Sequence, residues 1–430
     1  MTAFINQPII NIGCLGSVSD GKSTCVEKLT GKHTQQHSQE KKRNITIKQG
    51  YANAKLWKDS KGNVYSTDSQ LTSFKNQEGE ECKIFNQVSF VDCPGHHLLM
   101  KTMLLGISLM HGAIVVVAVN EPLSSKPQLI QHLAAAKLGK LDKKLIFCLN
   151  KIDLVSKEVL FKRKQELEEL LVQYDIVPYA VIPTCFNQRI GIDHLTNAIM
   201  QLFNPSEYLE KSNVPCFFEI SRTFDINLPG KSYDEVSGGV FGGSLQAGTI
   251  KTGDVLEIRP GLVMKTKEGK FECTPFQTKV LSIESQKMTL DSLIPGGLAS
   301  IATTIDPYYF KGDGESKSTS KDGLIGHVVG IPGQMPSVFS EIKLDLTIVT
   351  LFGFEWKPEV KDIIVIQIGT RVCDALVKEI NKTMITIQLA KPCCICDNKH
   401  VIICKNIDKI LRIVGEGTIK YSDNPIKLIE

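Results

Sequence analysis

An eight-residue segment near the start of the chain has the spacing of a phosphate-binding loop. It reads Gly16-Ser17-Val18-Ser19-Asp20-Gly21-Lys22-Ser23, the pattern G-x-x-x-x-G-K-S. In this pattern backbone N–H groups surround the phosphates of a nucleotide, the lysine reaches the outer phosphates, and the last hydroxyl binds Mg²⁺. We therefore predict the phosphate contacts at Ser19, Asp20, Gly21, Lys22, Ser23 and Thr24.

A second segment supplies selectivity for the base. Asn150-Lys151-Ile152-Asp153 follows an apolar run, and the Asp153 carboxylate can accept hydrogen bonds from the N1–H and N2–H₂ edge of guanine. Adenine offers neither donor, so it would leave a buried carboxylate unpaired, at a cost of about 1–3 kcal/mol. The two motifs together predict a guanine-nucleotide site that includes Asn150, Lys151 and Asp153.

Two further segments fit a nucleotide-dependent switch. Asp92-Cys93-Pro94-Gly95 would place the Asp92 carboxylate near Mg²⁺ and the Gly95 N–H near the γ-phosphate. Thr46 is a second candidate hydroxyl ligand of Mg²⁺, in a segment that would become ordered with GTP. Taken alone, a D-x-x-G segment is typical of a turn, and Thr46 could simply be a residue of a strand. The predicted metal ligands are Ser23, Thr46 and Asp92.

The same segment supplies a candidate for the hydrolytic step. His96 follows Gly95 directly, and a neutral imidazole can orient or polarise an attacking water at physiological pH. The predicted catalytic residues are His96, Gly95 and Lys22.

The composition is that of a globular protein with several domains. The chain has 430 residues, of which 42% are hydrophobic and 22% charged, and this length favours two to four domains. The longest apolar run, residues 113–119, is too short to cross a bilayer, and the N-terminus lacks a secretory pattern. Thirteen cysteines, an odd number, favour reduced thiols and a cytoplasmic location. With a net charge of +4, a nucleic-acid partner would need local basic patches.

The pattern of elements changes in the middle of the chain. Strands expected at residues 9–15, 88–91, 113–119, 145–149 and 180–182 alternate with helices expected at 22–29 and 157–174. From residue 215 the chain consists of short β-rich runs separated by turn residues, as in β-barrels. The predicted fold is an α/β P-loop GTPase domain (1–207) followed by two all-β barrel domains (208–325 and 326–430).

Several strings resemble one family, the gamma subunits of eukaryotic and archaeal translation initiation factor 2. In the first half they are RNITIKQGYANAK (43–55), FVDCPGH (90–96) and NKIDL (150–154). In the second half they are GGVFGGSLQAGTIKTGDVLEIRPG (238–261), PGGLASIATTIDP (295–307) and GHVVGIPGQMPSVF (326–339). GYANAK and GGVxGGS distinguish this family among the elongation factor Tu-like translational GTPases.

The resemblance implies a function and a set of partners. It implies GTP-dependent carriage of methionylated initiator tRNA to the small ribosomal subunit, with GTP hydrolysis as the release switch and slow turnover without an activating protein. It implies GTP/GDP and Mg²⁺ as ligands. The implied partners are alpha and beta subunits in a heterotrimer, GTPase-activating proteins and nucleotide-exchange factors, with no membrane. Tyr51 is a candidate for stacking on the tRNA end, or for interface packing. Lys48, Lys55, Lys251 and Arg259 are candidate phosphate contacts.

The chain departs from the family pattern at three places. Ser17 and Asp20 replace histidines of the phosphate loop, and Asp20 brings a carboxylate close to the phosphates unless it faces away. Cys185 and Phe186 stand where a Ser-Ala pair backs the guanine, so that Cys185, Phe186 and Asn187 complete the implied base site. Relatives carry a zinc-binding cysteine ribbon between residues 55 and 88. Here that stretch retains only Cys82, so no zinc is expected.

Other interpretations remain open at this point. The cluster Cys393-Cys394-Ile395-Cys396 with His400 could suggest a metal, but adjacent strand residues point to opposite faces, which favours buried free thiols. The departures in the loop leave room for a GTP-binding scaffold with little or no hydrolysis. A regulatory GTPase of sulfate activation, or an elongation-type or selenocysteine-type tRNA carrier, would share the architecture.

Overall fold

The computed structural model of the chain divides into two compact units, residues 1–208 and 209–430. The described residues are 7–34, 50–203, 210–227, 236–286, 288–310, 323–351, 355–396, 398–421 and 424–429. Among them, no helix is both long and apolar enough to cross a bilayer.

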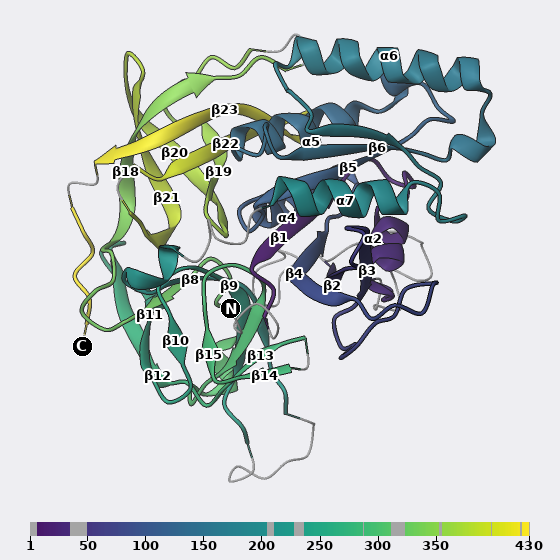
Figure 1. The fold of residues 1–430 in the computed structure, drawn as a ribbon. Coiled ribbons are helices and arrows are strands. Elements are labelled where there is room, and N and C mark those ends of the chain that lie inside the picture. The colour runs from purple at the N-terminus through teal and green to yellow at the C-terminus, as the bar shows by residue number, and fades with distance from the viewer. Residues whose placement is uncertain are drawn as a thin grey trace. The chain divides into compact units, whose positions relative to one another are not determined.

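The first unit is built on a seven-stranded sheet with the order β3-β2-β4-β1-β5-β6-β7 (Figure 1). The central strands are parallel, and β2 pairs antiparallel with both β3 and β4. Strand β1 and strand β5 are buried along their whole length, which explains why their sequences, apart from Asn11, are apolar or glycine without alternation. The strands are β1 Ile10–Leu15, β2 Gly50–Lys58, β3 Val64–Asp68, β4 Lys83–Asp92, β5 Gly112–Ala118, β6 Leu145–Asn150 and β7 Ala180–Pro183.

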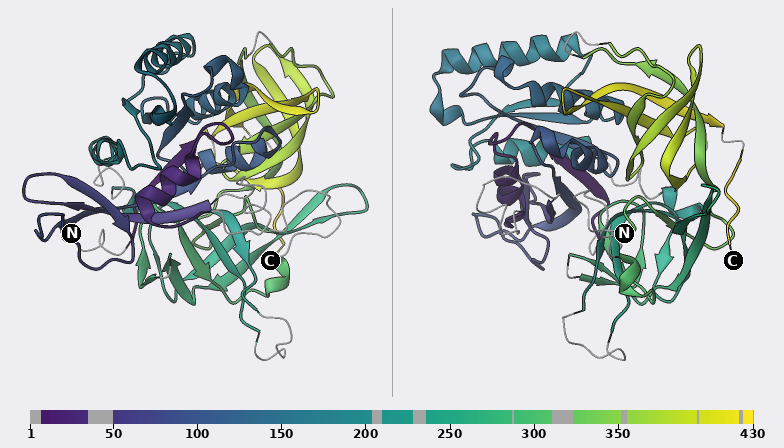
Figure 2. Two further views of the ribbon diagram at one scale, coloured as in Figure 1. Left: turned by 90° about the vertical axis from the view of Figure 1, so that its right-hand side faces the viewer. Right: turned by 180° about the vertical axis from the view of Figure 1, so that it is seen from behind.

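Helices connect the parallel strands, as the crossovers of a parallel sheet require. Helix α2 contacts α7, and α4 contacts α5; α2 and α7 lie on the side of the sheet that faces the viewer in Figure 1, and Figure 2 shows the unit from behind. The helices are α2 Lys22–Thr30, α4 Met100–Ile107, α5 Pro127–Leu138, α6 Lys157–Gln173 and α7 Ile192–Leu202, with 3-10 turns η1 His97–Leu99, η2 Leu123–Ser125 and η3 Ile152–Leu154.

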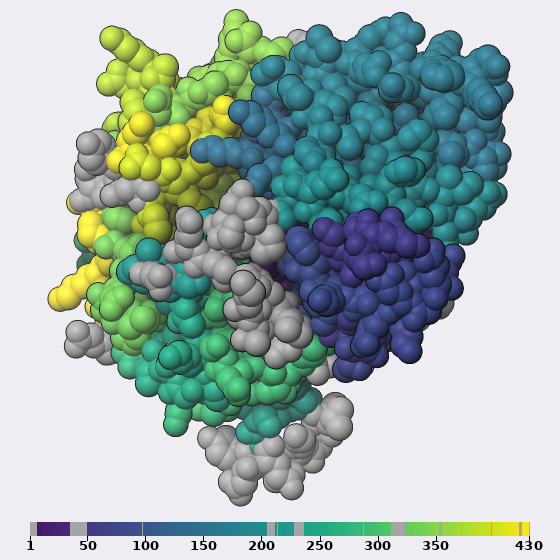
Figure 3. All heavy atoms as spheres, viewed as in Figure 1, coloured from purple at the N-terminus to yellow at the C-terminus, as the bar shows by residue number. Residues whose placement is uncertain are grey.

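Local sequence signals fix where these helices begin. The Ser156 hydroxyl accepts the Val159 N–H and caps α6, and Pro127 occupies the first turn of α5. Helix α6 buries only Leu167 and Leu171 and lies on the outer surface of its unit (Figures 1 and 3). The strands and helices predicted in the first half of the chain are confirmed, with ends displaced by at most one residue except in β4, which begins five residues before the predicted strand 88–91.

The first β-rich part of the second unit is an eight-stranded sheet, β12-β11-β17-β8-β9-β16-β13-β14, with β10 and β15 as a separate pair. Its apolar core includes Phe218, Phe241 and Ile301. The elements are η4 Glu210–Asn213, β8 Phe217–Phe224, β9 Val240–Ala247, β10 Ile250–Lys251, β11 Val255–Lys265, β12 Phe271–Lys279, β13 Ser282–Ser285, β14 Met288–Leu290, β15 Ser292–Leu293, β16 Ala299–Ala302, η6 Pro307–Phe310 and β17 Val328–Gly330.

The second β-rich part is a closed barrel with the order β18-β21-β20-β19-β22-β23. Closure removes unpaired sheet edges, and Trp356, Ile366 and Ile403 lie in the barrel core. The strands are β18 Val338–Ile348, β19 Ile363–Ile368, β20 Arg371–Asn381, β21 Met384–Cys394, β22 His400–Ile407 and β23 Ile410–Tyr421. The predicted class, an α/β domain followed by all-β domains, is confirmed.

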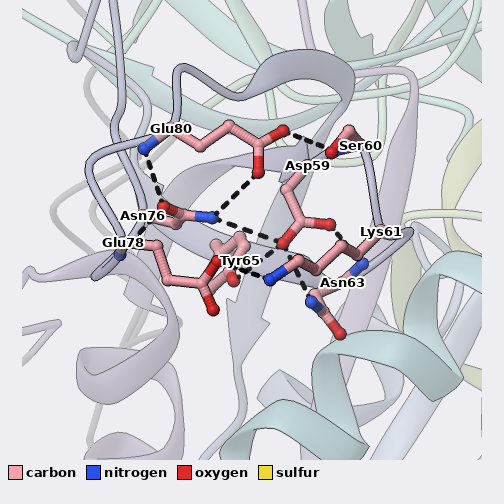
Figure 4. Close-up of polar contacts among 8 residues, drawn as sticks. All are labelled: Asp59, Ser60, Lys61, Asn63, Tyr65, Asn76, Glu78 and Glu80. Carbon is pink, nitrogen blue, oxygen red and sulfur yellow. Dashed lines mark hydrogen bonds and ion pairs between the residues drawn. The ribbon is translucent and has the colours of Figure 1, made fainter.

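A polar network holds the loops that flank β3 (Figure 4), in the stretch between residues 55 and 88 whose single cysteine is Cys82. The Asp59 carboxylate accepts hydrogen bonds from the Asn63 N–H at 2.7 Å and the Tyr65 hydroxyl at 3.1 Å, and a longer one from the Asn76 amide at 3.4 Å. Burial raises the pKa of Asp59, but these bonds outweigh it and hold that pKa below its usual value.

The Asp59 network should therefore weaken in acid. A carboxylate with a depressed pKa stabilises the fold fully above its ordinary pKa, near pH 4, and loses this contribution as the pH falls through the lowered value. Trp57 packs against Phe74 beside the network, so in a Trp356→Phe background its fluorescence should report an acid transition below about pH 4. Asp59→Asn should weaken that transition, whereas Asp175→Asn, at a side chain that is 92% exposed, should not. An identical transition in Asp59→Asn would refute this role.

Candidate nucleotide site

The predicted phosphate loop connects β1 to α2 with a backbone that turns repeatedly into the left-handed region. The φ angles are +138° at Gly16, +64° at Ser19 and +104° at Gly21. A Cβ on Gly16 would clash with the Val116 carbonyl oxygen, so this glycine is required by close approach as well as by its φ. Gly21 precedes α2 without a side-chain cap, and the first N–H groups of this helix are thus left for an anion.

Lys22 and Gly95 meet directly at this loop. The Lys22 side chain is buried, and its ammonium donates to the Ser17 carbonyl oxygen at 2.6 Å. A Cβ on Gly95 would lie 2.5 Å from Lys22 Nζ and 2.8 Å from the Gly16 carbonyl oxygen. The D-x-x-G segment therefore packs against the phosphate loop with no room for a side chain, as the sequence predicted for two segments that serve one site.

The predicted metal ligands Ser23 and Asp92 are also brought together. The Ser23 hydroxyl donates to the Asp92 carboxylate at 2.7 Å, and the Thr34 hydroxyl donates to the same oxygen at 2.6 Å. Thr46 lies outside the described residues. One hydroxyl and one carboxylate suit Mg²⁺, which commonly takes few protein ligands and completes its shell with water and phosphate oxygens. Such a site needs no cluster of three His, Cys, Asp or Glu side chains, and none converges among the described residues.

Asn150 links the base motif to the phosphate loop. Its amide nitrogen donates to the Asp20 carbonyl oxygen at 2.8 Å, and its side-chain oxygen accepts the Phe186 N–H at 3.2 Å. The Phe186 ring is buried and lies on the loop side, since a Cβ on Gly21 would be 3.7 Å from its Cδ2. Lys151 adopts a positive φ of 65°, which turns the chain sharply after β6.

The Asp153 carboxylate is exposed and neighbours the Cys185 thiol. Burial raises the pKa of the Cys185 thiol, and the hydrogen bond with Asp153 raises it further. Asn187 is exposed beside them. The segment 185–187 thus lies next to the carboxylate that is predicted to select guanine, and Cys185 can keep that carboxylate oriented without adding charge.

His96 is half-buried and caps the turn η1. Its Nδ1 accepts the Leu98 N–H at 3.3 Å, which places the proton of the neutral ring on Nε2. With this tautomer Nε2 can donate a hydrogen bond to a water oxygen, which fits orientation of water rather than removal of its proton.

The Asp20 carboxylate faces the interior of the first unit and not the open side of the loop. Asp20 is 1% exposed and forms an ion pair with Lys126, which is 4% exposed. His132 on α5 accepts the Gly16 N–H at 3.1 Å, and burial lowers the pKa of His132 to about 3, so it is neutral at physiological pH. Lys126, His132 and Thr34 escape prediction from the sequence, because none of them belongs to a spaced motif.

The remaining candidates are the side chains predicted to contact tRNA, and some of them already bind other groups of the protein. Lys55 is buried, with its ammonium donating to the Leu71 carbonyl oxygen at 2.8 Å, and burial lowers its pKa. Arg259 forms an ion pair with Glu257 and donates to two backbone carbonyls. The structure thus contradicts Lys55 and Arg259 as tRNA phosphate contacts. Lys251 is exposed and Tyr51 half-buried, while Lys48 lies outside the described residues.

The cysteines near the end of the chain do not converge with His400. Cys393 and Cys394 are buried free thiols, and burial raises the pKa of Cys393 to about 12. The Cys394 thiol donates to the Pro336 carbonyl oxygen at 3.2 Å, while His400 contacts the Glu416 carboxylate at 2.7 Å. These contacts agree with the expectation of buried thiols.

The contact between Gly95 and the loop predicts a steric penalty. Gly95→Ala forces the loop and Lys22 to shift, and we expect it to lower the free energy of unfolding of the first unit by about 1–3 kcal/mol. Urea unfolding followed by Trp57 fluorescence, in the Trp356→Phe background, measures this change. Leu98→Ala, at a side chain that is 72% exposed, is the control and should change stability by no more than about 0.5 kcal/mol. Equal stability of Gly95→Ala and its parent would contradict the packing.

Comparison with known proteins identifies the family of this chain. Residues 7–205 match the elongation factor Tu GTP binding domain, and residues 355–419 match the C-terminal domain of initiation factor eIF2 gamma. The eukaryotic translation initiation factor 2 subunit gamma of Encephalitozoon cuniculi is 36% identical over 425 residues, covering 96% of this chain and 93% of that protein. The translation initiation factor 2 subunit gamma of Pyrococcus furiosus is 36% identical over 421 residues, covering 96% and 98%.

A solved structure shares the fold. A bacterial selenocysteine-specific elongation factor superimposes with a TM-score of 0.69 at 19% identity, over 96% of this chain and 58% of that one. At this identity the likeness concerns the fold alone, whereas the two gamma subunits match along nearly the whole chain. The chain therefore belongs to the translation initiation factor 2 gamma family of translational GTPases.

Proposed function

We propose that this chain carries methionylated initiator tRNA to the small ribosomal subunit under the control of GTP, and that hydrolysis releases the tRNA. The observation that carries the proposal is the meeting of the phosphate loop, the D-x-x-G segment and the base motif through Lys22, Gly95 and Asn150. In a member of this family, such a site supports a nucleotide-dependent switch.

The residues around the loop fit a bound guanine nucleotide. Ser19, Gly21, Lys22, Ser23 and Thr24 would surround its phosphates, with Asp20 shaping the loop from behind. The Ser17 hydroxyl is buried without a hydrogen-bond partner among the described residues, and a ligand oxygen would satisfy it. Ser23, Asp92 and Thr46 would hold Mg²⁺, which supplies charge neutralisation at the phosphates. Asn150, Lys151, Asp153, Cys185, Phe186 and Asn187 would form the base site.

Three residues of the site, Gly95, Lys22 and His96, would take part in hydrolysis. The Gly95 N–H would bind a γ-phosphate oxygen, and the Lys22 ammonium would exchange the Ser17 carbonyl for phosphate oxygens. His96 would orient the attacking water through Nε2–H. We expect slow turnover without an activating protein, because GTPases commonly depend on a group that such a protein supplies to stabilise the transition state.

The partners follow from the same proposal. They are alpha and beta subunits of the factor, initiator tRNA, the small ribosomal subunit, and GTPase-activating and nucleotide-exchange factors, in the cytoplasm. Loss of the γ-phosphate would relax residues 92–96 and the segment around Thr46, and the tRNA end would then be released. The domain limits 1–207, 208–325 and 326–430 are part of this proposal.

A second function is favoured by the departures in the loop and the base site. Ser17, Asp20 and the Cys185-Phe186 pair differ from the family pattern, which would suit a GTP-binding scaffold with little or no hydrolysis. Single-turnover hydrolysis with and without ribosomes separates the two. An elongation-type or selenocysteine-type carrier would instead prefer an elongator or selenocysteine tRNA over the initiator.

The role of Asp153 predicts a change of base preference. Asp153→Asn replaces an acceptor by an amide, which loses the guanine N2–H₂ donor and gains the xanthine C2 carbonyl as a partner. We expect GDP affinity to fall about tenfold or more while xanthosine diphosphate binds better than it does to the unmodified chain. Competition against a fluorescent guanine nucleotide measures both, with Asp175→Asn as the matched control. Unchanged GDP affinity in Asp153→Asn would exclude the assignment.

The carrier function predicts nucleotide-dependent tRNA binding. Filter binding of methionylated initiator tRNA should be severalfold tighter with a non-hydrolysable GTP analogue than with GDP, because the γ-phosphate orders the switch segments. Unacylated initiator tRNA is the control and should respond less. A flat response to the two nucleotides would leave the carrier proposal refuted.

A further inference from the structure

A buried ion pair lies behind the phosphate loop. The Asp20 carboxylate contacts the Lys126 ammonium directly, and both side chains are at least 96% buried. Lys126 lies between the turn η2 and helix α5, more than one hundred residues from Asp20 in the sequence. Moving such a charge pair from water into the interior costs several kcal/mol of desolvation free energy per ion. We therefore ask what this pair does at the site.

The same carboxylate organises the loop backbone. One Asp20 oxygen accepts the Ala118 N–H at the end of β5 at 3.3 Å, and the other accepts the Ser17 N–H at 2.8 Å. The carboxylate therefore spans three elements, namely the phosphate loop, the end of β5 and the start of α5. Its geometry fixes where the loop lies relative to the central sheet.

Helix α5 holds the loop at a second point. His132 accepts the Gly16 N–H through Nδ1 at 3.1 Å, and it is buried in the second turn of α5. Asn150 holds the Asp20 carbonyl from the side of the base motif at 2.8 Å. Gly16 and Asp20 are thus each held by side chains from outside the loop. Of these side chains, His132, Asn150 and Lys126, only Lys126 carries a full positive charge.

The charge matters because the loop is expected to bind an anion. An unpaired carboxylate buried behind the phosphates would repel them in a medium of low dielectric constant. Paired with Lys126, Asp20 has its charge compensated and can still bind the loop N–H groups. In the pair, the Asp20 carboxylate still accepts hydrogen bonds from the loop, and its repulsion of the phosphates is offset by the Lys126 charge.

We propose that Lys126 is a positioning residue for nucleotide binding: its ion pair with Asp20 fixes residues 16–21 and compensates a carboxylate that would otherwise oppose the phosphates. The inference rests on the proposed nucleotide site and deepens it. The Lys126 ammonium lies at the back of the loop, where it contacts the Asp20 carboxylate and, at 3.9 Å, the carboxylate of the exposed Glu121. Lys126 would therefore act on the bound nucleotide through Asp20.

A double-mutant cycle in the full-length chain tests the proposal. The variants are Lys126→Gln, Asp20→Asn and the two combined, and the readouts are affinity for fluorescent GDP and GTP analogues and thermal unfolding without nucleotide. Lys126→Gln should weaken GDP binding at least tenfold and GTP binding more, because GTP carries the larger negative charge. The double variant, which lacks both charges of this pair, should recover most of that loss.

A matched control comes from the same helix. Lys137 lies in the last turn of α5 and pairs with the exposed Asp175 at 3.1 Å, so Lys137→Gln changes the net charge of the chain equally. Its nucleotide affinity should stay within about twofold of the unmodified chain, because exposed ion pairs are weak. If Lys137→Gln lost as much nucleotide affinity as Lys126→Gln, the change in net charge alone would account for both losses, and the proposal would be overturned.

Hydrogen exchange separates positioning from general stability. Without nucleotide, Lys126→Gln should speed exchange of peptides that contain residues 16–21 while the barrel β18–β23 exchanges as before. If Lys126→Gln alone does not fold, recovery of both folding and nucleotide binding in the double variant supports the compensation of charge. A lowered unfolding temperature with unchanged GDP and GTP affinity would show a purely structural pair and overturn the proposal. Failure of the unmodified chain to bind either nucleotide would instead refute the underlying site.

Discussion

The candidate site depends on two hydrogen bonds that the Asn150 side chain makes. Its amide donates to the phosphate loop at the Asp20 carbonyl, and its oxygen accepts the Phe186 N–H from the segment beside Asp153. A single planar group at the end of β6 thereby fixes the distance between the part of the site that would hold phosphates and the part that would hold the base. Because both hydrogen bonds are buried, losing either would leave an unpaired polar group.

The central sheet explains why these groups can meet. The parallel strands β1, β4, β5 and β6 end at one edge, and ligands in such sheets bind beyond the carboxyl ends of the strands. Asp92 ends β4, Asn150 ends β6, and the phosphate loop follows β1. Helix α5 and the residue before it then close the back of the loop with His132 and Lys126, so that the loop is held in its left-handed conformation from behind as well as from the side.

Much of this could be predicted from the sequence, because glycine spacing, strand ends and motif order are local signals. Residues 16–23, Asp92 and Asn150 lie together as those signals indicated. Lys126, His132 and Thr34 could not be predicted, since their contacts join distant parts of the chain and no spacing encodes them. Charge alone also misled: Lys55 and Arg259 are basic, yet their side chains are committed to contacts within their own fold. Thr46 lies outside the described residues.

The most direct test is nucleotide competition with the unmodified chain in the presence of Mg²⁺. Binding of a fluorescent GDP analogue should be displaced by GDP and by GTP, while ATP should require a concentration about tenfold higher or more, because adenine leaves the Asp153 carboxylate without donors. Equal displacement by ATP, or no binding of the GDP analogue, would contradict the account.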